Sequence, residues 1–301
     1  MTDALDADGA LSLLANEVRL DVIRALGVAT IEGAGIGYLS YSELLDCVAV
    51  SDSGRFNYHL GELTGPFVRR YDDGYALTTQ GRLAFQHLVA GGFTTDRRVD
   101  AFDVDQACHQ CGNALVAEYG FGWERPLAPL FVVKCWDCGA EYERTYVPPR
   151  GVEQRSREEL LVAADYRNRM ETASLVRGIC PWCAGHAETR VRERDGDLPA
   201  SADGSDLAVY VEHHCTSCTG FHYTAVGETL RYHPDVVAFF ANRGHDLYGI
   251  PKWRLPWAVT DEHLTWYGPN PWDLRVEVPC DGDVLRARLD GEATVLETTV
   301  L

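Results

Sequence analysis

Residues 50–63 read Val50-Ser51-Asp52-Ser53-Gly54-Arg55-Phe56-Asn57-Tyr58-His59-Leu60-Gly61-Glu62-Leu63, which predicts a turn followed by a short helix. On a helical wheel of about 100° per residue, Phe56, Leu60 and Leu63 fall together on the expected core side. Asn57, Tyr58, Gly61 and Glu62 point away, and Arg55 and His59 lie on the two borders. Such a helix packs on a core through one face and presents the other to a ligand.

Two amphipathic segments precede this stretch. Apolar residues recur at three- and four-residue steps from Ala10 to Leu26, which predicts one helix that Gly27 ends. A glycine-rich loop at 33–37 leads to a second helix at 41–48, with Ser42 as its N-cap. Cys47 is alone on this helix, and we expect it to be a small core residue.

A hairpin and a further helix follow the stretch. Strands are expected at 67–70 and 75–78, and Asp73-Gly74 supplies the positive φ angles that a tight turn needs. The next helix runs from Thr79 to Val89, and Gly91-Gly92 ends it. Three helices, a hairpin and a helix predict a winged helix-turn-helix domain over residues 1–92, in a chain of the α+β class.

These 92 residues resemble an ArsR-type winged helix-turn-helix transcriptional regulator, in the halophilic-archaeal version with a cysteine-rich C-terminal region. The resemblance rests on Leu13-Leu14-Ala15-Asn16-Glu17-Val18-Arg19-Leu20, on Tyr58-His59-Leu60 with Leu63, and on Asp72-Asp73-Gly74-Tyr75. It implies a homodimer that binds palindromic double-stranded DNA and pairs through its first and last helices. Metal sensors of this type often carry Cys-Val-Cys in the second helix. Here Ala49 follows Cys47-Val48, so we expect no metal sensing there.

The outward face of residues 50–63 and the hairpin, or wing, supply the candidate DNA contacts. Polar and basic side chains of an inserted helix bind base edges and phosphates, and wing arginines hold the backbone. The candidates are Ser53, Arg55, Asn57, Tyr58, His59, Arg69 and Arg70. For His59, contact with DNA and partial burial as a hydrogen-bonded histidine both stay open. For the whole stretch, the alternative is an ordinary surface helix.

The charge of the chain opposes phosphate binding as a whole but not everywhere. The formal net charge is −18 over 301 residues, and lysine occurs only at 134 and 252. This composition resembles that of proteins from salt-accumulating halophiles, whose acidic surfaces keep them in solution. Between Arg55 and Arg98 the balance reverses, because six arginines face only Glu62, Asp72, Asp73 and Asp96. A DNA-facing patch is therefore expected in this interval.

Eight of the ten cysteines form four Cys-x-x-Cys pairs. In an intracellular chain of this length, such spacing predicts metal ligands instead of disulfides. A tight pair directs both sulfurs to one point, and two pairs complete a tetrahedral Zn²⁺ site; glycine after the second cysteine of each pair in the first set suits the turn. Two structural zinc sites are expected, one from Cys108, Cys111, Cys135 and Cys138, the other from Cys180, Cys183, Cys215 and Cys218.

Two other uses of the second set are disfavoured. Cys180-Pro181-Trp182-Cys183 alone matches a redox pair, but no βαβ pattern surrounds it. His186-Ala187-Glu188 with the Cys215 pair resembles a zinc deaminase, although His214 stands where that motif has proline. Four thiolates leave no open position for substrate, so we expect no catalytic residues and no enzyme.

The remaining segments complete a modular organisation. A polar linker is expected at 93–107, zinc-ribbon-like modules at 108–150 and 179–232, and a helical connector at 151–178 capped by Ser156 and Glu159. A helix and a β meander fill 233–301, with turns at 281–282 and 290–291. Four tryptophans of this tail, at 253, 257, 266 and 272, either form its core or line a ligand pocket.

Taken together, these features predict a sequence-specific DNA-binding transcriptional regulator whose effector is a small molecule or a protein. The alternative is an adaptor of the transcription machinery, because a winged helix with a zinc ribbon also resembles transcription factor E. No run of about 18 apolar residues is present, and the acidic N-terminus is unlike a secretory signal. We therefore expect a cytoplasmic protein without a membrane partner.

Overall fold

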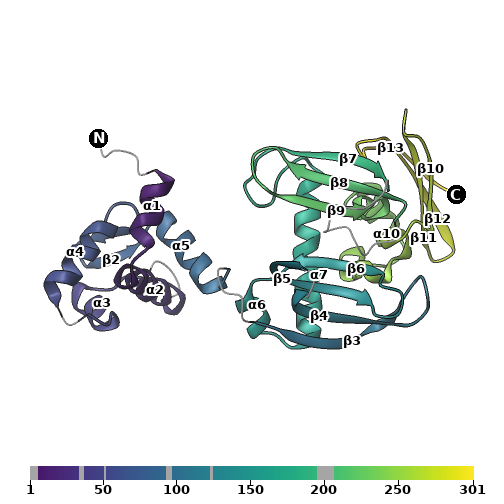
Figure 1. Ribbon diagram of the computed structural model, residues 1–301. Coiled ribbons are helices and arrows are strands. Elements are labelled where there is room, and N and C mark those ends of the chain that lie inside the picture. Colours follow the sequence, from purple (N-terminus) through teal and green to yellow (C-terminus); the bar gives the residue numbers. More distant parts are fainter. Residues whose placement is uncertain (1–5, 34–36, 51, 93–96, 123–124, 195–206) are drawn as a thin grey trace. The chain divides into compact units, whose positions relative to one another are not determined.

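The computed structural model describes residues 6–33, 37–50, 52–92, 97–122, 125–194 and 207–301 (Figure 1), with the side chains of 121–129 also left out. The chain has the predicted α+β class, with helices and several small sheets. Two compact units make it up: Met1–Thr94 with Pro148–Arg150, and Thr95–Val147 with Gly151–Leu301. In the part of the chain that the structure describes, no helix is long and apolar enough to cross a membrane.

Helix α2 is the centre of the first unit. The elements in order are α1 (Ala7–Leu14), α2 (Glu17–Glu32), α3 (Tyr41–Cys47), α4 (Ser53–Leu63), β1 (Val68–Tyr71), β2 (Gly74–Leu77) and α5 (Thr79–Ala90). α2 contacts α3, α4, α5 and β2. Its fully buried Val22, Ile23 and Leu26 form one core with Phe56 and Leu63 of α4, because the apolar stripes of these helices face one another.

The single helix expected from Ala10 to Leu26 is two helices, and that prediction is wrong. Asn16 lies between them, and its side chain accepts a hydrogen bond from the Arg19 amide (3.3 Å), which caps α2. α2 continues past Gly27 to Glu32. Gly27 serves packing instead, because a Cβ atom there would lie 2.3 Å from the Phe85 ring of α5.

Two predictions about α3 are also corrected. Ser40, not Ser42, is its N-cap, and Ser40 forms a capping box with Glu43. Cys47 ends this helix and is exposed, so it is not the core residue that we expected. The glycine-rich loop before α3 lies partly outside the described residues, which omit 34–36.

The predicted hairpin forms, but its glycine has another role. β1 and β2 pair antiparallel, and the turn between them is Asp72-Asp73. Leu39 forms a bridge with Tyr75 on the other side of β2. Gly74 has φ +156°, and a Cβ atom there would lie 2.4 Å from the Leu39 carbonyl oxygen. Glycine is therefore needed for the approach of Leu39, not for the turn. α5 ends as predicted, at Gly91 with φ +74°.

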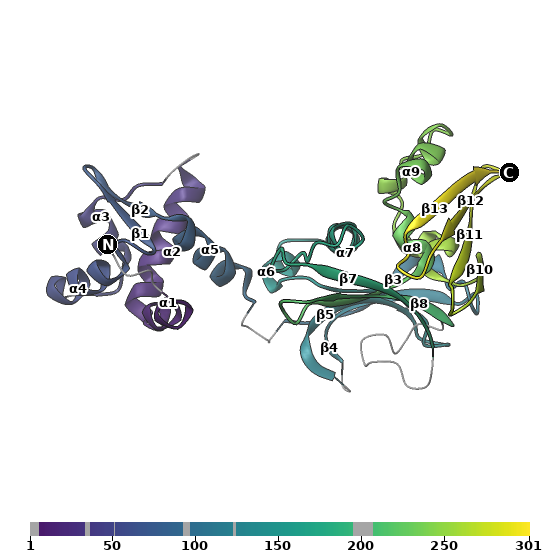
Figure 2. The same cartoon turned by 90° about the horizontal axis from the view of Figure 1, so that it is seen from above.

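The second unit contains three antiparallel sheets, β3-β4-β5-β6, β7-β8-β9 and β10-β11-β12-β13. Its strands are β3 (Val99–Ala107), β4 (Ala114–Gly122), β5 (Arg125–Cys135), β6 (Glu141–Tyr146), β7 (Ala187–Glu193), β8 (Val209–Cys215), β9 (Phe221–Ala225), β10 (Leu264–Tyr267), β11 (Asp273–Cys280), β12 (Asp283–Leu289) and β13 (Val295–Val300). Its helices are α7 (Arg157–Leu175), α8 (Val226–Leu230), α9 (Pro234–Ala241), η1 (Leu247–Gly249), η2 (Lys252–Arg254) and α10 (Pro256–Val259). Helix α6 (Pro149–Glu153) is divided between the units, since Pro149 and Arg150 belong to the first and the rest to the second. Figures 1 and 2 show α7 lying across the first two sheets, and it contacts β6 and β7.

Part of the expected linker at 93–107 is a strand. β3 begins at Val99 and pairs with β4, and the linker's residues 93–96 lie outside the described part of the chain. Phe102 and Val104 are buried while the aspartates beside them are exposed, which is the period of a half-buried strand. The high charge of this segment belongs to its solvent face.

The segments expected to be separate modules share two cores. One core joins the β3–β6 sheet to α7 and includes Trp253. The other joins β7 and β8 to the last sheet and includes Trp257. Both tryptophans are 2% exposed, and Trp266 and Trp272 pack against the second core, so the tail tryptophans are core residues. α8 and α10 approach closely, since a Cβ atom on Gly227 would lie 1.7 Å from the Trp257 carbonyl oxygen.

A buried ionic centre lies where β6, α7, α8 and η2 meet. It consists of Glu143, Asp165, Glu228, Arg231 and Lys252, each at most 5% exposed. Lys252 Nζ lies 3.2 Å from Glu228 Oε1 and 3.5 Å from Glu143 Oε2. Asp165 Oδ1 accepts a hydrogen bond from the Lys252 amide (3.2 Å) and lies 3.8 Å from Arg231 Nη2.

The two carboxyl groups nearest Lys252 favour its protonated form. Burial lowers the pKa of Lys252, but Glu143 and Glu228 outweigh that effect and raise it above the usual value. Burial, together with the negative Glu228 and Asp165, raises the pKa of Glu143 to about 8 against the opposing charge of Lys252. Removing the lysine would therefore leave buried carboxylates without their cation, which is the costly case for a buried ion pair.

We predict that Lys252→Met lowers the free energy of unfolding of the second unit by about 3–5 kcal/mol. All seven tryptophans follow residue 122, so their fluorescence during urea unfolding reports this unit. Lys134→Met is the matched control, since Lys134 is the only other lysine and pairs with Glu118 nearer the surface. We expect a change of about 0–1 kcal/mol there. Equal effects of the two substitutions would contradict a stabilising ionic centre.

Candidate metal centres and nucleic-acid interface

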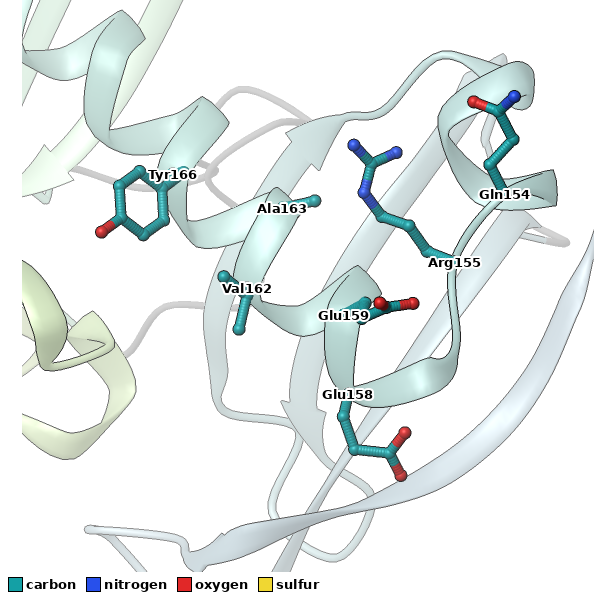
Figure 3. Close-up of a pocket in the computed structure, with 7 residues that line it drawn as sticks. All are labelled: Gln154, Arg155, Glu158, Glu159, Val162, Ala163 and Tyr166. Atoms are coloured by element: carbon teal, nitrogen blue, oxygen red, sulfur yellow. The ribbon is translucent and has the colours of Figure 1, made fainter.

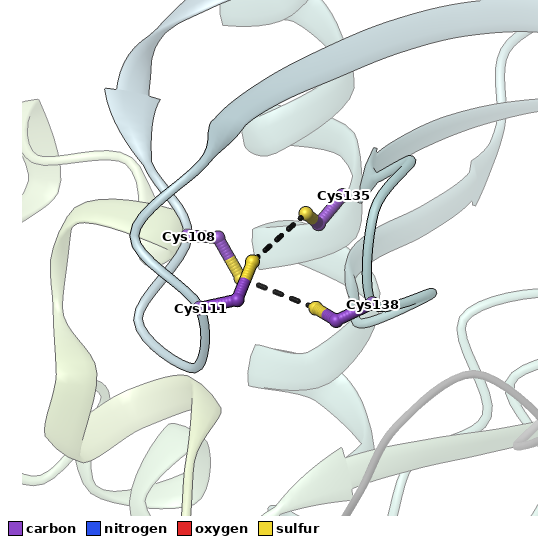
Figure 4. A group of neighbouring side chains, drawn as sticks. All are labelled: Cys108, Cys111, Cys135 and Cys138. Carbon is purple, nitrogen blue, oxygen red and sulfur yellow. Dashed lines mark hydrogen bonds between the residues drawn. The ribbon is translucent and has the colours of Figure 1, made fainter.

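Cys108, Cys111, Cys135 and Cys138 form the first cysteine cluster, which Figure 4 shows with its sulfurs turned toward one another. Sγ of Cys108 lies 3.6 Å from Sγ of Cys138, and Sγ of Cys111 lies 3.5 Å from Sγ of Cys135. Cys108 follows β3, and Cys135 ends β5. Pairing of these strands through β4 brings the two turns together.

Cys180, Cys183, Cys215 and Cys218 form the second cluster, between the segment that precedes β7 and the end of β8. The matching sulfur–sulfur distances are 3.7 Å for Cys180 and Cys218 and 3.5 Å for Cys183 and Cys215. All eight cysteines are free thiols rather than disulfides. The structure therefore brings together both sets of cysteines that the sequence predicted.

The four turns share one backbone pattern. In each turn, the amide of the first cysteine donates a hydrogen bond to the carbonyl oxygen five residues later. The pairs are Cys108 to Asn113 (2.7 Å), Cys135 to Ala140 (2.8 Å), Cys180 to Gly185 (2.9 Å) and Cys215 to Gly220 (2.8 Å). Gly112 and Gly139 have φ +78° and +79°, as predicted for the residue after the second cysteine. In the second cluster Ala184 takes this position, with φ +58°.

Hydrogen bonds from backbone amides and from neighbouring sulfurs lower the pKa of some thiols in each cluster and raise the pKa of others. Burial raises the pKa of Cys108, but hydrogen bonds from Tyr142 and from backbone amides outweigh it and lower the pKa to about 6. The amide of Ser217, with that of Cys218, lowers the pKa of Cys215 to about 6. Both clusters thus contain a thiol that ionises readily beside others that keep their protons, and a bound cation would favour the thiolate form of all four.

The geometry of both clusters suits a tetrahedral metal ion. A Zn–S distance of about 2.3 Å gives sulfur–sulfur edges of about 3.8 Å in a regular tetrahedron. Within each cluster all four sulfurs lie within 4.8 Å of one another. Both clusters could therefore hold a metal ion through four sulfurs.

A third group of possible ligands is His245, Cys280 and Asp281. His245 Nε2 lies 2.8 Å from Asp281 Oδ2, so these two side chains already pair with each other. Cys280 packs in the core that includes Trp257. A hydrogen bond between His245 and Asp281, beside a core cysteine, accounts for this group.

The outward face of α4 carries most of the candidate DNA contacts. Ser53 is the first residue of the helix, after the N-cap Asp52. Arg55, Asn57 and Tyr58 are exposed, the last with 60% of its surface accessible. No atom lies within 4 Å of a Cβ atom built on Gly61, so this face is open.

Of the two alternatives left open for His59, the structure has the buried, hydrogen-bonded one, and the side chain is not on the outward face. Only 7% of His59 is exposed, and its Nδ1 accepts a hydrogen bond from Arg19 Nε of α2 (3.3 Å). Burial, then the charges of Arg19 and Arg55, lower its pKa. His59 is therefore a neutral core residue that joins α4 to α2. The helical wheel placed His59 only on the border of the apolar face, and in the structure the core also covers that border.

The hairpin exposes the two predicted arginines. Arg69 and Arg70 lie on β1, and their guanidinium groups are about 6 Å from the ring centres of Tyr71 and Tyr75. Of the other arginines in the basic interval, Arg97 belongs to the second unit, where it pairs with Glu153. Asp96 lies outside the described residues.

Comparison with known proteins finds two family models. Residues 7–88, from α1 to α5, match a family described as a domain of unknown function, DUF7347. Residues 105–295, with both cysteine clusters and most of the three sheets, match a second one, DUF7351. No curated protein and no solved structure matches. Because the second match spans more than half of the chain, the protein belongs to the DUF7351 family.

Proposed function

We propose that this protein is a sequence-specific DNA-binding transcriptional regulator, in which the first unit is a winged helix-turn-helix domain. α4 is the recognition helix, and the β1–β2 hairpin is the wing. The observation that carries the proposal is the two-sided α4, which buries Phe56 and Leu63 and exposes Arg55, Asn57 and Tyr58. Arginine and asparagine are the side chains that read guanine and adenine edges in the major groove.

Exposed arginines on α4 and β1 support DNA binding by this unit, although the net charge of the whole chain is −18. Arg55 is exposed on α4, and Arg69 and Arg70 are exposed on β1. Contacts to phosphates fix the register of a protein on DNA, while base contacts give specificity. In concentrated salt the release of counterions contributes little, so the hydrogen bonds of α4 must provide most of the affinity.

We further propose that both cysteine clusters hold structural Zn²⁺. Four thiolates fill a tetrahedral zinc ion and leave no position for water or substrate, which supports a role in folding and not in catalysis. Each cluster ties the ends of strands that are distant in sequence, such as β3 and β5. Zinc binding would then contribute directly to the stability of the second unit.

An adaptor that works mainly through protein contacts is the second candidate, and one observation favours it. Trp136 and Trp182 each lie between the two cysteines of a turn and are 59% and 45% exposed. Exposed tryptophans are typical of protein interfaces. Co-purification with RNA polymerase, without selective DNA binding, would favour this candidate.

The DNA proposal predicts that Arg55→Ala with Asn57→Ala lowers affinity for the preferred DNA by about 30- to 10,000-fold. The range follows from the loss of two base contacts, each of which contributes about 1–3 kcal/mol. The DNA would be selected from a random duplex library with the full chain, and binding would be measured by fluorescence anisotropy. The circular dichroism spectrum should not change, because both side chains are exposed.

Arg286→Ala with Asn242→Ala is the matched control for the DNA test. Both side chains are exposed in the second unit, and together they remove the same charge and the same kind of amide. We expect wild-type binding from this variant. Equal binding by the α4 variant and the wild type, or failure to select any sequence, would contradict the proposal.

The metal proposal predicts two zinc ions per chain and one after Cys138→Ser. The Cys138 side chain is exposed, so its loss should remove a ligand without disturbing the core. Native mass spectrometry gives the metal count, and urea unfolding gives stability, which we expect to fall. Cys47→Ser is the control, because Cys47 is also exposed but belongs to neither cluster. A count unaffected by Cys138→Ser would exclude a metal ion at the first cluster.

A further inference from the structure

Helix α7 presents an apolar stripe to solvent. Of residues 160–175, only Val162, Tyr166 and Met170 are exposed, with 56%, 49% and 70% of their surfaces accessible. They are four residues apart and so lie in one row along the helix. The opposite face of α7 packs on the β3–β6 sheet through Leu160 and Ala164. A row of only apolar side chains on the exposed face of a long helix indicates a covered surface.

The stripe is held in place and has a hollow beside it. The Arg169 guanidinium lies 4.9 Å from the Tyr166 ring centre and 5.8 Å from that of Tyr248, so it fixes both rings. Arg169 itself is buried and paired with Asp165. A hollow of about 950 Å³ lies along the N-terminal half of the helix. Figure 3 shows Glu158, Val162 and Tyr166 among the residues that line it.

The charges at the ends of the stripe select its partner. Glu158 is exposed one turn before Val162, and Arg177 is exposed two turns after Met170. Arg155, which lines the hollow, and Arg177 each donate to the carbonyl oxygen four residues earlier, and Arg157 stacks on Phe102. Glu158 and Arg177 are set apart by their spacing, because they stand four residues before Val162 and seven after Met170, in line with the stripe. The stripe therefore has an acidic group in line with it at one end and a basic group at the other.

We infer that α7 pairs with α7 of a second copy of this chain, antiparallel and about a two-fold axis. In this arrangement Tyr166 of one copy meets Met170 of the other, and Glu158 meets Arg177. The midpoint in sequence between Tyr166 and Met170 is position 168, and the midpoint between Glu158 and Arg177 lies within one residue of it. One two-fold axis near position 168 can therefore form both pairs. A parallel arrangement would place Glu158 beside Glu158 and Arg177 beside Arg177. A two-fold contact is the common form of a self-complementary surface.

The pairing surface differs from the one that the family resemblance implies for the first unit. It uses only residues of the second unit and does not require that the protein bind DNA. Met170 of the second copy is long and flexible, and it lies opposite Tyr166 at the edge of the hollow. The apolar contacts should strengthen in concentrated salt, while the two ion pairs should weaken.

The test is the mass of the full zinc-loaded chain, measured by sedimentation equilibrium at 0.15 M and about 2 M KCl. We expect a dimer for the wild type, and for Met170→Glu a dissociation constant at least about 100-fold higher, because the new carboxylate would be buried without a partner. Leu296→Glu is the matched control. Leu296 is 52% exposed on β13, away from α7, and this variant should remain dimeric.

A charge exchange tests the antiparallel direction. Glu158→Arg should weaken the dimer about 3- to 10-fold at 0.15 M KCl, because it places like charges together. Adding Arg177→Glu should restore the wild-type constant, whereas a parallel pair would gain nothing from the double exchange. Tryptophan fluorescence and the metal count should not change in any of these variants.

Two results would overturn the inference. The first is a wild type that is monomeric up to about 100 μM, and the second is a dimer that Met170→Glu leaves intact. Dissociation of such a dimer by Leu83→Glu would place the contact on the first unit instead, since Leu83 is 52% exposed on α5. The variant Arg55→Ala with Asn57→Ala should keep the dimer mass, so failure of DNA binding and failure of α7 pairing are separate outcomes.

Discussion

The second unit depends on keeping one lysine charged inside the protein. Lys252 on η2 reaches Glu143 on the first sheet and Glu228 on α8, and its amide donates to Asp165 on α7. Each of these groups loses its hydration on folding, and only their close contacts offset that cost. Because the contacts join segments that lie between residues 143 and 252, they require one arrangement of the sheets about α7. Apolar packing alone would tolerate several arrangements.

Because of this ionic centre, the cysteine clusters are not independent of the rest of the second unit. As independent zinc ribbons, each cluster would stabilise only its own hairpin. Here the first cluster is linked to the same η2 segment, because His109 beside Cys108 has its Nε2 atom 2.8 Å from the Trp253 carbonyl oxygen. Tyr142, which contacts Cys108 Sγ at 3.1 Å, precedes Glu143 on β6. A metal ion bound at this cluster would therefore support the same strand, β6, as the ionic centre does.

The sequence predicted what depends on short-range patterns. The cysteine spacing, the Ser156–Glu159 capping box, the hairpin, α4 and the tail strands from 273 onward all follow from residues a few positions apart, and the structure has them. What was missed depends on distant residues. The packing role of Gly27 depends on Phe85, and α8 depends on Glu228 meeting Lys252. The choice between the two alternatives for His59 depends on Arg19, 40 residues away. β3 was taken for a linker because its solvent-facing aspartates hid the alternation of Phe102 and Val104.

The proposed DNA-binding role requires affinity from a source other than the overall electric field of the protein, because the net charge is −18. A single α4 offers few outward side chains, and each base contact adds only about 1–3 kcal/mol. Two copies on a palindromic site double those contacts, and a link between the copies makes the second binding event intramolecular. A two-fold pair of α7 helices would supply the symmetry that such a site requires wherever the first unit sits, since one axis relates every part of both chains. Its apolar centre would also persist in the salt that screens the surface charges. The stripe on α7 and the polar face of α4 would then both increase the affinity for DNA. A protein without a positive electrostatic field has to gain that affinity from shape complementarity and from the number of contacts.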